Sequence, residues 1–291
     1  MRRLADRYLA AVVKGFETSE HGSDLLPQVL ARACVAVLPV TGAGLGLAEK
    51  LRVPLGGSDD AVGRAERLQT TLGEGPCLAA IETGRALTAD KSEIAARWPA
   101  YHRELVRQTP FRAVASLPLR VPGQPPVGAL DLYTDDVRMP PDASSAEVQA
   151  AIADQISGLL FDAPLVRADW TDEPVAAWLA GPDVAGRMQV WEAVGMVMQT
   201  LAATQGEGLA LLREYAQGNG ATLDTVAERL VTEQLTPADL LEDQLRRGTF
   251  GTPDHGSGQQ SGYGFDAAPP AVSSLADQRR PESGGRRSGR L

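Results

Sequence analysis

The chain has 291 residues, of which 43% are hydrophobic and 22% are charged. This composition is typical of soluble globular proteins, and the length allows two domains. Its formal net charge of -9 excludes nucleic-acid binding driven by bulk charge, so any such binding must depend on a local patch.

Cysteine content and hydropathy indicate a reduced, membrane-free location. Two cysteines, Cys34 and Cys77, are too few for a disulfide scaffold. No run approaches the roughly 18 apolar residues of a membrane helix. The N-terminus is basic, but Lys14 and Glu17 interrupt the apolar run that a signal-peptide core would need. We therefore expect a cytoplasmic protein without a membrane partner.

The N-terminal part mixes helix and strand patterns. Residues 1–39 are expected to be helical, with Ser23 as an N-cap and with Cys34 as a buried thiol on the apolar stripe. Residues 40–57 predict a hairpin of two short strands. Its glycines lack the spacing and the Gly-Lys-Ser/Thr of nucleotide-binding loops, which argues against nucleotide binding.

The pattern continues with alternating helices and strands. Further helices are expected over 60–71, after Pro76 and over 98–109, and strands over 113–119 and 127–133 with a turn at 122–126. A helix over 144–161 closes the domain. Residues 1–162 therefore predict one α+β domain, an antiparallel sheet flanked by helices.

The remaining chain has no strand pattern. A connector is expected over 163–182, and an all-α domain over 183–247. Residues 218–220 (Gly-Asn-Gly) break one helix, and Thr236, Pro237 and Asp239 begin another with a capping pattern. Residues 248–291 are rich in Gly, Ser and Pro, which predicts a disordered tail.

Four motifs in residues 20–162 resemble the GAF domain of actinobacterial proteins. They are residues 72–77 (Leu-Gly-Glu-Gly-Pro-Cys), 97–99 (Arg-Trp-Pro), 114–119 (Val-Ala-Ser-Leu-Pro-Leu) and 127–133 (Val-Gly-Ala-Leu-Asp-Leu-Tyr). The resemblance implies a domain that senses a small molecule or forms a dimer.

Residues 183–235 resemble an ANTAR domain, a three-helix bundle. The resemblance rests on Arg187, on residues 192–195 (Glu-Ala-Val-Gly), on 212–216 (Leu-Arg-Glu-Tyr-Ala) and on 226–231 (Val-Ala-Glu-Arg-Leu-Val). It implies a transcription antitermination regulator that binds RNA stem-loops as a homodimer. The RNA-binding candidates are Arg187, Trp191, Arg213, Tyr215 and Arg229.

This output domain departs from its family. Val194 replaces the family's lysine, and Glu192 replaces its glutamine. Between 183 and 235, three basic residues oppose seven acidic ones, a net charge of -4. Because RNA affinity depends largely on Lys and Arg, these departures favour an alternative: a dimeric ligand-sensing or protein-interaction regulator that does not bind RNA.

The chain shows no pattern of an enzyme. His21, His102 and His255 lack partners at metal-ligand spacing, so no metal site and no catalytic residue is predicted. No cofactor is indicated. Cys77 follows Gly-Glu-Gly-Pro near a helix start, a placement that could lower a thiol pKa. We consider it both as a sensor thiol and as a packed structural residue.

Overall fold

The computed structural model describes residues 2–18, 26–47, 53–162 and 182–248. The expected N-cap at Ser23, nearly all of the connector and the expected disordered tail lie outside these residues. No helix in the described ranges is long and apolar enough to cross a membrane.

The five strands of the described residues form one antiparallel sheet in the order β2-β1-β5-β4-β3. The strands are β1 Gly42–Leu47, β2 Val53–Gly57, β3 Leu87–Ala89, β4 Ala113–Arg120 and β5 Pro126–Thr134. The expected hairpin over 40–57 is present as β1 and β2, and the longer pair is present as β4 and β5. Because β1, β4 and β5 are buried on both faces, they consist largely of consecutive apolar residues.

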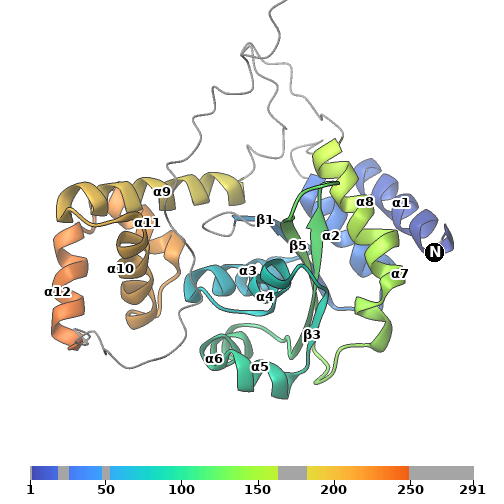
Figure 1. Cartoon of the computed structure of the whole chain (residues 1–291), viewed down its shortest axis with the longest axis horizontal. Coiled ribbons are helices and arrows are strands. Elements are labelled where there is room, and N and C mark those ends of the chain that lie inside the picture. Colours follow the sequence, from blue (N-terminus) through green and yellow to red (C-terminus); the bar gives the residue numbers. More distant parts are fainter. Residues whose placement is uncertain (1, 19–25, 48–52, 163–181, 249–291) are drawn as a thin grey trace, which may run out of the picture. The chain divides into compact units, whose positions relative to one another are not determined.

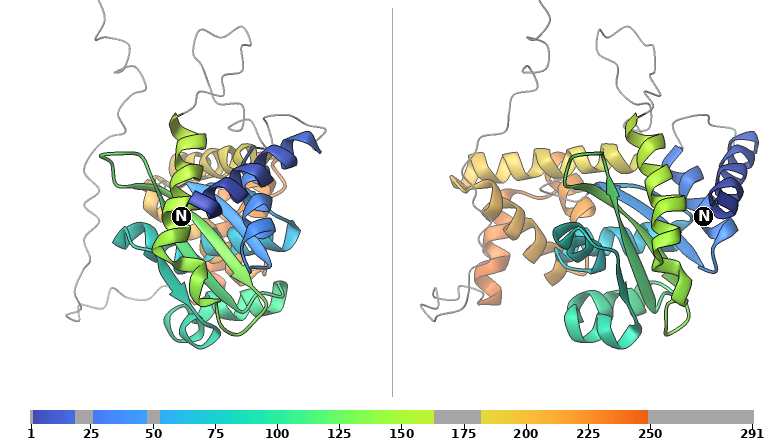
Figure 2. Two further views of the ribbon diagram at one scale, coloured as in Figure 1. Left: turned by 90° about the vertical axis from the view of Figure 1, so that its right-hand side faces the viewer. Right: turned by 45° about the vertical axis from the view of Figure 1, so that its right-hand side comes forward.

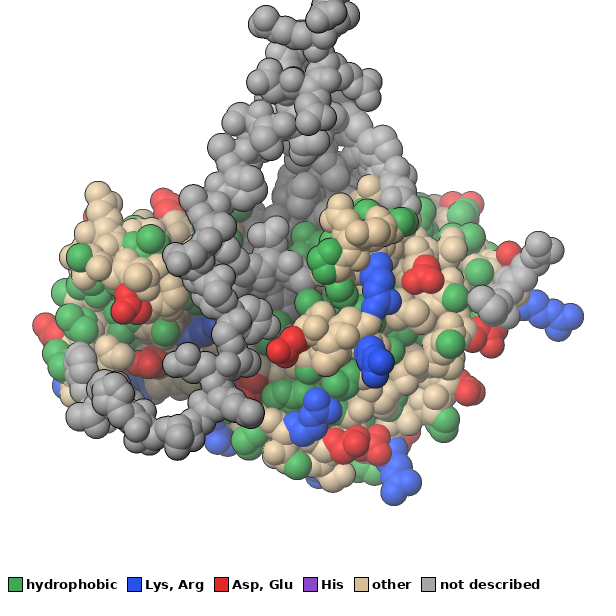
Figure 3. Space-filling view, viewed as in Figure 1, with side chains coloured by type: hydrophobic (Ala, Val, Ile, Leu, Met, Phe, Trp, Pro, Cys, Tyr) green, Lys and Arg blue, Asp and Glu red, His purple; other side chains and the backbone are tan. Residues whose placement is uncertain are grey.

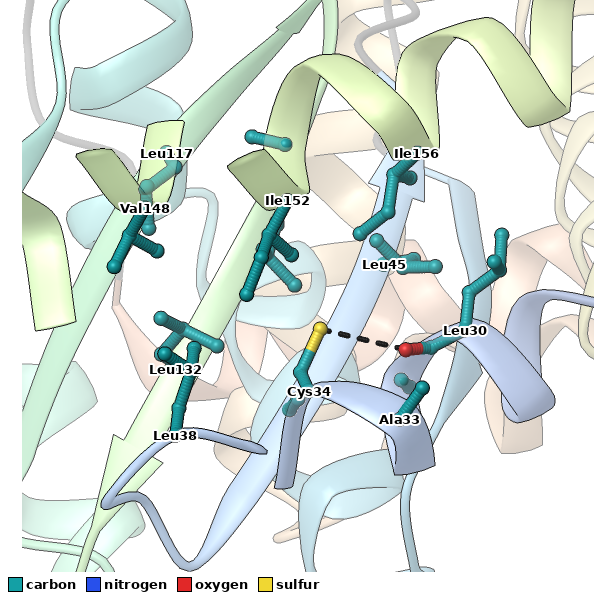
Figure 4. Close-up of a cluster of buried hydrophobic side chains, with 14 of the residues drawn as sticks. Leu30, Ala33, Cys34, Leu38, Leu45, Leu117, Leu132, Val148, Ile152 and Ile156 are labelled. Carbon is teal, nitrogen blue, oxygen red and sulfur yellow. Dashed lines mark hydrogen bonds between the residues drawn. The ribbon is translucent and has the colours of Figure 1, made fainter. Parts of the chain in front are cut away.

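One face of the sheet is covered by the N-terminal helices and the closing helix (Figures 1 and 2). These are α1 Arg2–Glu17, α2 Leu26–Val37, α7 Ala146–Val148 and α8 Asp154–Ser157. Figure 4 shows how Cys34 and Leu30 of α2 pack with Leu45 of β1 and with Ile152 and Ile156 of the closing helix. The thiol of Cys34 is buried, as the apolar stripe predicts, and it donates to the carbonyl oxygen of Leu30 at 3.3 Å.

The opposite face is covered by the helices between β2 and β4 (Figure 1). These are α3 Asp60–Leu72, α4 Pro76–Thr83, α5 Lys91–Arg97 and α6 Pro99–Gln108. A second core forms there, in which the rings of Phe111 and Tyr133 stack with centroids 4.8 Å apart. The expected α+β domain, an antiparallel sheet between helices, is confirmed.

The structure differs from the expectation in three local features. The strand β3 and the helix α5 were not expected, because three and seven residues are too short to show a period. The closing helix is not a regular α-helix. It contains two stretches with wider, π-type turns, Gln149–Ala153 and Gly158–Asp162.

Residues 182–247 form four helices: α9 Pro182–Leu201, α10 Gln205–Gly218, α11 Leu223–Val231 and α12 Pro237–Arg247. Their apolar faces share one core that includes Val194, Leu212 and Val226. Threonine N-caps begin the last three helices, and Thr236 forms the expected capping box with Asp239. The expected all-helical unit is present, with α12 packed on α9 and α10.

Candidate functional site

A row of three residues crosses the sheet on the side of α3 and α4. Gly44 of β1 is paired with Asp131 of β5, and Asp131 is paired with Ser116 of β4. Side chains alternate between the two faces of a strand, so these residues lie opposite Leu45, Leu130 and Leu117, which belong to the other core. The side chains of Asp131 and Ser116 are fully buried.

Two polar side chains of α3 reach this row. Glu66 and Gln69 are one turn apart on the buried face of the helix. The hydroxyl of Tyr133 donates to Oε1 of Glu66 at 2.7 Å. Nε2 of Gln69 donates to Oδ2 of Asp131 at 2.9 Å and to the hydroxyl oxygen of Tyr133 at 3.2 Å. We call Glu66, Gln69, Asp131 and Tyr133 the buried network.

Glycines provide the space that the buried network occupies. A Cβ on Gly44 would lie 2.5 Å from Oε1 of Glu66, so any side chain there would displace the carboxylate. Gly75 has φ of +146°, and a Cβ on it would clash with Oε1 of Gln69. Gly44 therefore admits α3 close to the sheet, and Gly75 admits the side chain of Gln69 beside the start of α4.

The buried network removes charged and polar groups from water. Two carboxyl groups are withdrawn from water, and such burial is costly unless hydrogen bonds or opposite charge compensate. The hydroxyl of Ser116 is also buried, and it has no hydrogen-bond partner within the described residues. The arrangement therefore places hydrogen-bond acceptors and a hydroxyl together in the interior beneath α3.

Cys77 lies next to the buried network, at the start of α4. Its backbone N–H donates to Oε1 of Gln69 at 2.9 Å, and its thiol is fully buried. An oxidant would reach this thiol only after α4 moves. The redox role of Cys77 stays a prediction.

The candidate RNA-binding residues are distributed over three helices of the helical unit. Trp191 of α9 and Tyr215 of α10 are half-buried and pack against its core. Arg213 is half-buried and lies against Gly73. Arg229 of α11 is half-buried. Hydrogen bonds from Thr236 lower the pKa of Asp239, and the charge of Arg229 adds a smaller effect in the same direction. The side chain of Arg187 lies outside the described residues.

Charges in this unit are partly paired. Arg246 bonds Glu242 at 3.3 Å, and Arg247 bonds Asp243 at 2.7 Å. Over the described residues of the face in Figure 3, basic side chains are mixed with acidic and apolar ones. Arg213 and Arg229 lie on different helices, α10 and α11. The role of the five candidates as one RNA surface therefore stays a prediction.

The residues of the buried network were not among the sequence-predicted candidates. Asp131 stands between two leucines in a strand that is buried on both faces, and Glu66 and Gln69 follow Val62 and Ala65 on the apolar side of α3. The one sequence signal that could have identified these residues is a polar residue within an otherwise apolar stripe. Within the described ranges, no group of three His, Cys, Asp or Glu could hold a metal ion.

Comparison with known proteins places the first part of the chain. The model of the GAF domain family matches residues 22–160. No curated protein matches the chain.

Three solved structures are among those similar to the chain. A domain described as belonging to a two-component sensor histidine kinase of Sinorhizobium meliloti is 12% identical, covers 48% of this chain and 92% of its own, and has a TM-score of 0.39. The GAF domain of a phosphoenolpyruvate-protein phosphotransferase of Coxiella burnetii is 14% identical. The match covers 53% of this chain and 91% of that domain, with a TM-score of 0.38. A free methionine-R-sulfoxide reductase of Thermoplasma acidophilum is 16% identical. The match covers 48% of this chain and 92% of the reductase, with a TM-score of 0.35.

The family match begins just before α2 and ends in the closing helix, so it contains the whole sheet and the buried network. It does not extend to the helical unit. Residues 22–160 of this chain are a GAF domain.

Proposed function

We propose that the chain is a non-catalytic, signal-responsive regulator of transcription antitermination. In this proposal the GAF domain binds a small molecule at the buried network and contributes to a homodimer. The helical unit binds an RNA stem-loop in the cytoplasm. The observation that carries the proposal is the order of the chain: a GAF domain at 22–160 is followed by a separate helical core that includes Val194, Leu212 and Val226.

The buried network supports the sensory part. A ligand would form its hydrogen bonds with Asp131, Gln69 and the hydroxyl of Ser116, which has no hydrogen-bond partner within the described residues. A ligand that binds only the folded state stabilises that state in proportion to the logarithm of its concentration. A melting-temperature screen of cytoplasmic metabolites tests this part, with Ser116→Ala as the variant that should lose the shift.

The RNA-binding part rests on the resemblance of the helical unit to ANTAR domains. Crosslinking in cells followed by sequencing identifies candidate hairpins, and fluorescence anisotropy at low salt measures their affinity. We expect Arg229→Ala to weaken binding, because a phosphate contact contributes to affinity on every hairpin. Arg246→Ala is the control, since this exposed arginine is paired with Glu242.

A second candidate function is a regulator that acts by protein interaction. The net charge of -4 over 183–235 and the half-buried position of Arg213 favour it. No measurable affinity for any crosslinked hairpin at low salt would decide for this second candidate.

A further inference from the structure

Two contacts join the helical unit to the C-terminal end of α3. The backbone N–H of Leu223, the first residue of α11, donates to Oγ1 of Thr71 at 3.2 Å. The guanidinium of Arg213 lies close to Gly73, because a Cβ on this glycine would be 3.1 Å from Nη1, 3.2 Å from Cζ and 3.5 Å from Nε. Residues of α3, α6, α10 and the α10–α11 turn line a cavity of about 90 Å³ beside them. We call this contact the α3 dock.

In the α3 dock, the charged guanidinium of Arg213 is partly buried and incompletely hydrogen-bonded. Burial lowers the pKa of this guanidinium, and its buried Nε has no hydrogen-bond partner in the described part of the chain. The C-terminal end of a helix attracts a cation through its unpaired carbonyl groups. Gly73 caps α3 in the left-handed conformation, with φ of +69°. The end of α3 therefore competes with any phosphate for Arg213.

Gln69 connects the α3 dock to the buried network. Its side chain donates to Asp131 and accepts from the backbone N–H of Cys77. Its backbone carbonyl accepts the N–H of Gly73 at 3.0 Å. A molecule that displaces the side chain of Gln69 would therefore act on Gly73, the residue that caps α3. Gly73 in turn lies beside the guanidinium of Arg213.

We propose that the α3 dock is an autoinhibitory contact that withholds Arg213 from phosphate groups, and that α3 transmits the state of the buried network to it. In the docked form, Arg213 belongs to the GAF surface. In the released form, Arg213 is a free cation on α10, available to the phosphates of a nucleic acid. The nucleic-acid part rests on the proposed function, whereas the dock itself does not.

The test labels arginine side chains of the full chain with phenylglyoxal, a dicarbonyl that reacts with accessible guanidinium groups, and reads each site by mass spectrometry. Arg246 of α12, whose side chain is 72% exposed, is the internal reference. We expect Arg213 to react much more slowly than Arg246. Thr71→Val should raise the rate at Arg213 about tenfold, because a buried N–H that loses its acceptor shifts an equilibrium by roughly that factor.

Matched controls separate undocking from loss of helix stability. Thr70→Val removes a hydroxyl that donates to the carbonyl of Glu66 within α3, and it should leave the rate unchanged. Gly73→Ala is a second undocking variant. Its control is Gly248→Ala, which carries the same conformational penalty at φ of +70° with no atom within 4 Å of the new methyl group. Melting curves confirm that each variant is folded.

Hairpin affinity is measured on the same variants. Faster labelling of Arg213 together with tighter hairpin binding in Thr71→Val supports both the dock and the proposed function. Faster labelling without any hairpin binding supports the dock and removes the RNA function. The dock is overturned if Arg213 reacts as fast as Arg246 in the unmodified chain, or if its rate is the same in both undocking variants as in the unmodified chain.

Discussion

The hydroxyl of Tyr133 donates to Oε1 of Glu66 at 2.7 Å and accepts a hydrogen bond from Nε2 of Gln69 at 3.2 Å. One atom of β5 thus binds two side chains of α3 that are more than 60 residues away in sequence. Both partners are buried. The hydroxyl therefore fixes the distance between the sheet and α3 and compensates part of the cost of burying the Glu66 carboxyl.

We predict that Tyr133→Phe destabilises the fold more than Tyr8→Phe. The first change deprives a buried carboxyl oxygen of its donor, which costs about 1–3 kcal/mol. The second removes a bond from the Tyr8 hydroxyl to the carbonyl of Leu30, worth about 0.5–1.5 kcal/mol. Urea unfolding of both variants measures the difference. Equal losses would mean that the hydroxyl of Tyr133 does not stabilise Glu66.

Much of the fold follows from local sequence patterns, whereas the buried network does not. Strands β4 and β5 are nearly continuous apolar runs, and Thr236, Pro237 and Asp239 mark the start of α12 unambiguously. Glutamate and glutamine favour exposed helix positions, so Glu66 and Gln69 predict solvent contact when α3 is considered alone. Their burial depends on the space left by the missing side chain of Gly44. That space lies under α3 only because β1 pairs with β5, which is a tertiary feature.

The position of Arg213 is a second feature beyond local patterns. Its motif places it on a helix and marks it as a candidate RNA ligand. Only the tertiary structure brings it to Gly73, 140 residues earlier in the chain. The glycine itself is predictable as a helix cap, but its partner is not.

The thiol of Cys34 should make stability fall with pH above about pH 9. Burial raises its pKa from 9.0 to about 12. The folded state therefore retains a proton that the unfolded chain loses, so the stabilisation is complete below pH 9 and is lost as pH rises toward 12. We expect unfolding free energy to fall in this range by up to about 1.4 kcal/mol per pH unit more than in Cys34→Ala. Urea titrations at several pH values check this, and parallel pH profiles for the two proteins would contradict it.

We predict a homodimer whose contacts include α1. Leu9 and Val13 lie one turn apart on this helix and are 37% and 58% exposed, so they form an apolar patch that a second copy could cover. Leu9→Glu combined with Val13→Glu should give a monomer in light scattering at micromolar concentration. Val137→Glu is the control, because Val137 is equally exposed, at 58%, in the loop after β5. An unmodified chain that is monomeric throughout this range would refute the dimer.

Residues 279–291 contain five arginines against one glutamate. A basic segment attracts phosphates without regard to sequence, and each phosphate contact adds about 0.7–0.9 to the slope of log affinity against log salt. Deletion of 279–291 should therefore weaken binding to all hairpins equally and reduce that slope.

A tail with four of its arginines replaced by glutamine separates charge from chain length. If charge is responsible, this variant should bind as the deletion does. Because residues 248–291 have too few apolar side chains to repay the entropy of ordering, truncation after Arg247 should leave the melting temperature unchanged. Equal salt slopes for the full and truncated chains would exclude the tail from binding. A large fall in melting temperature would instead show that it packs on the folded domains.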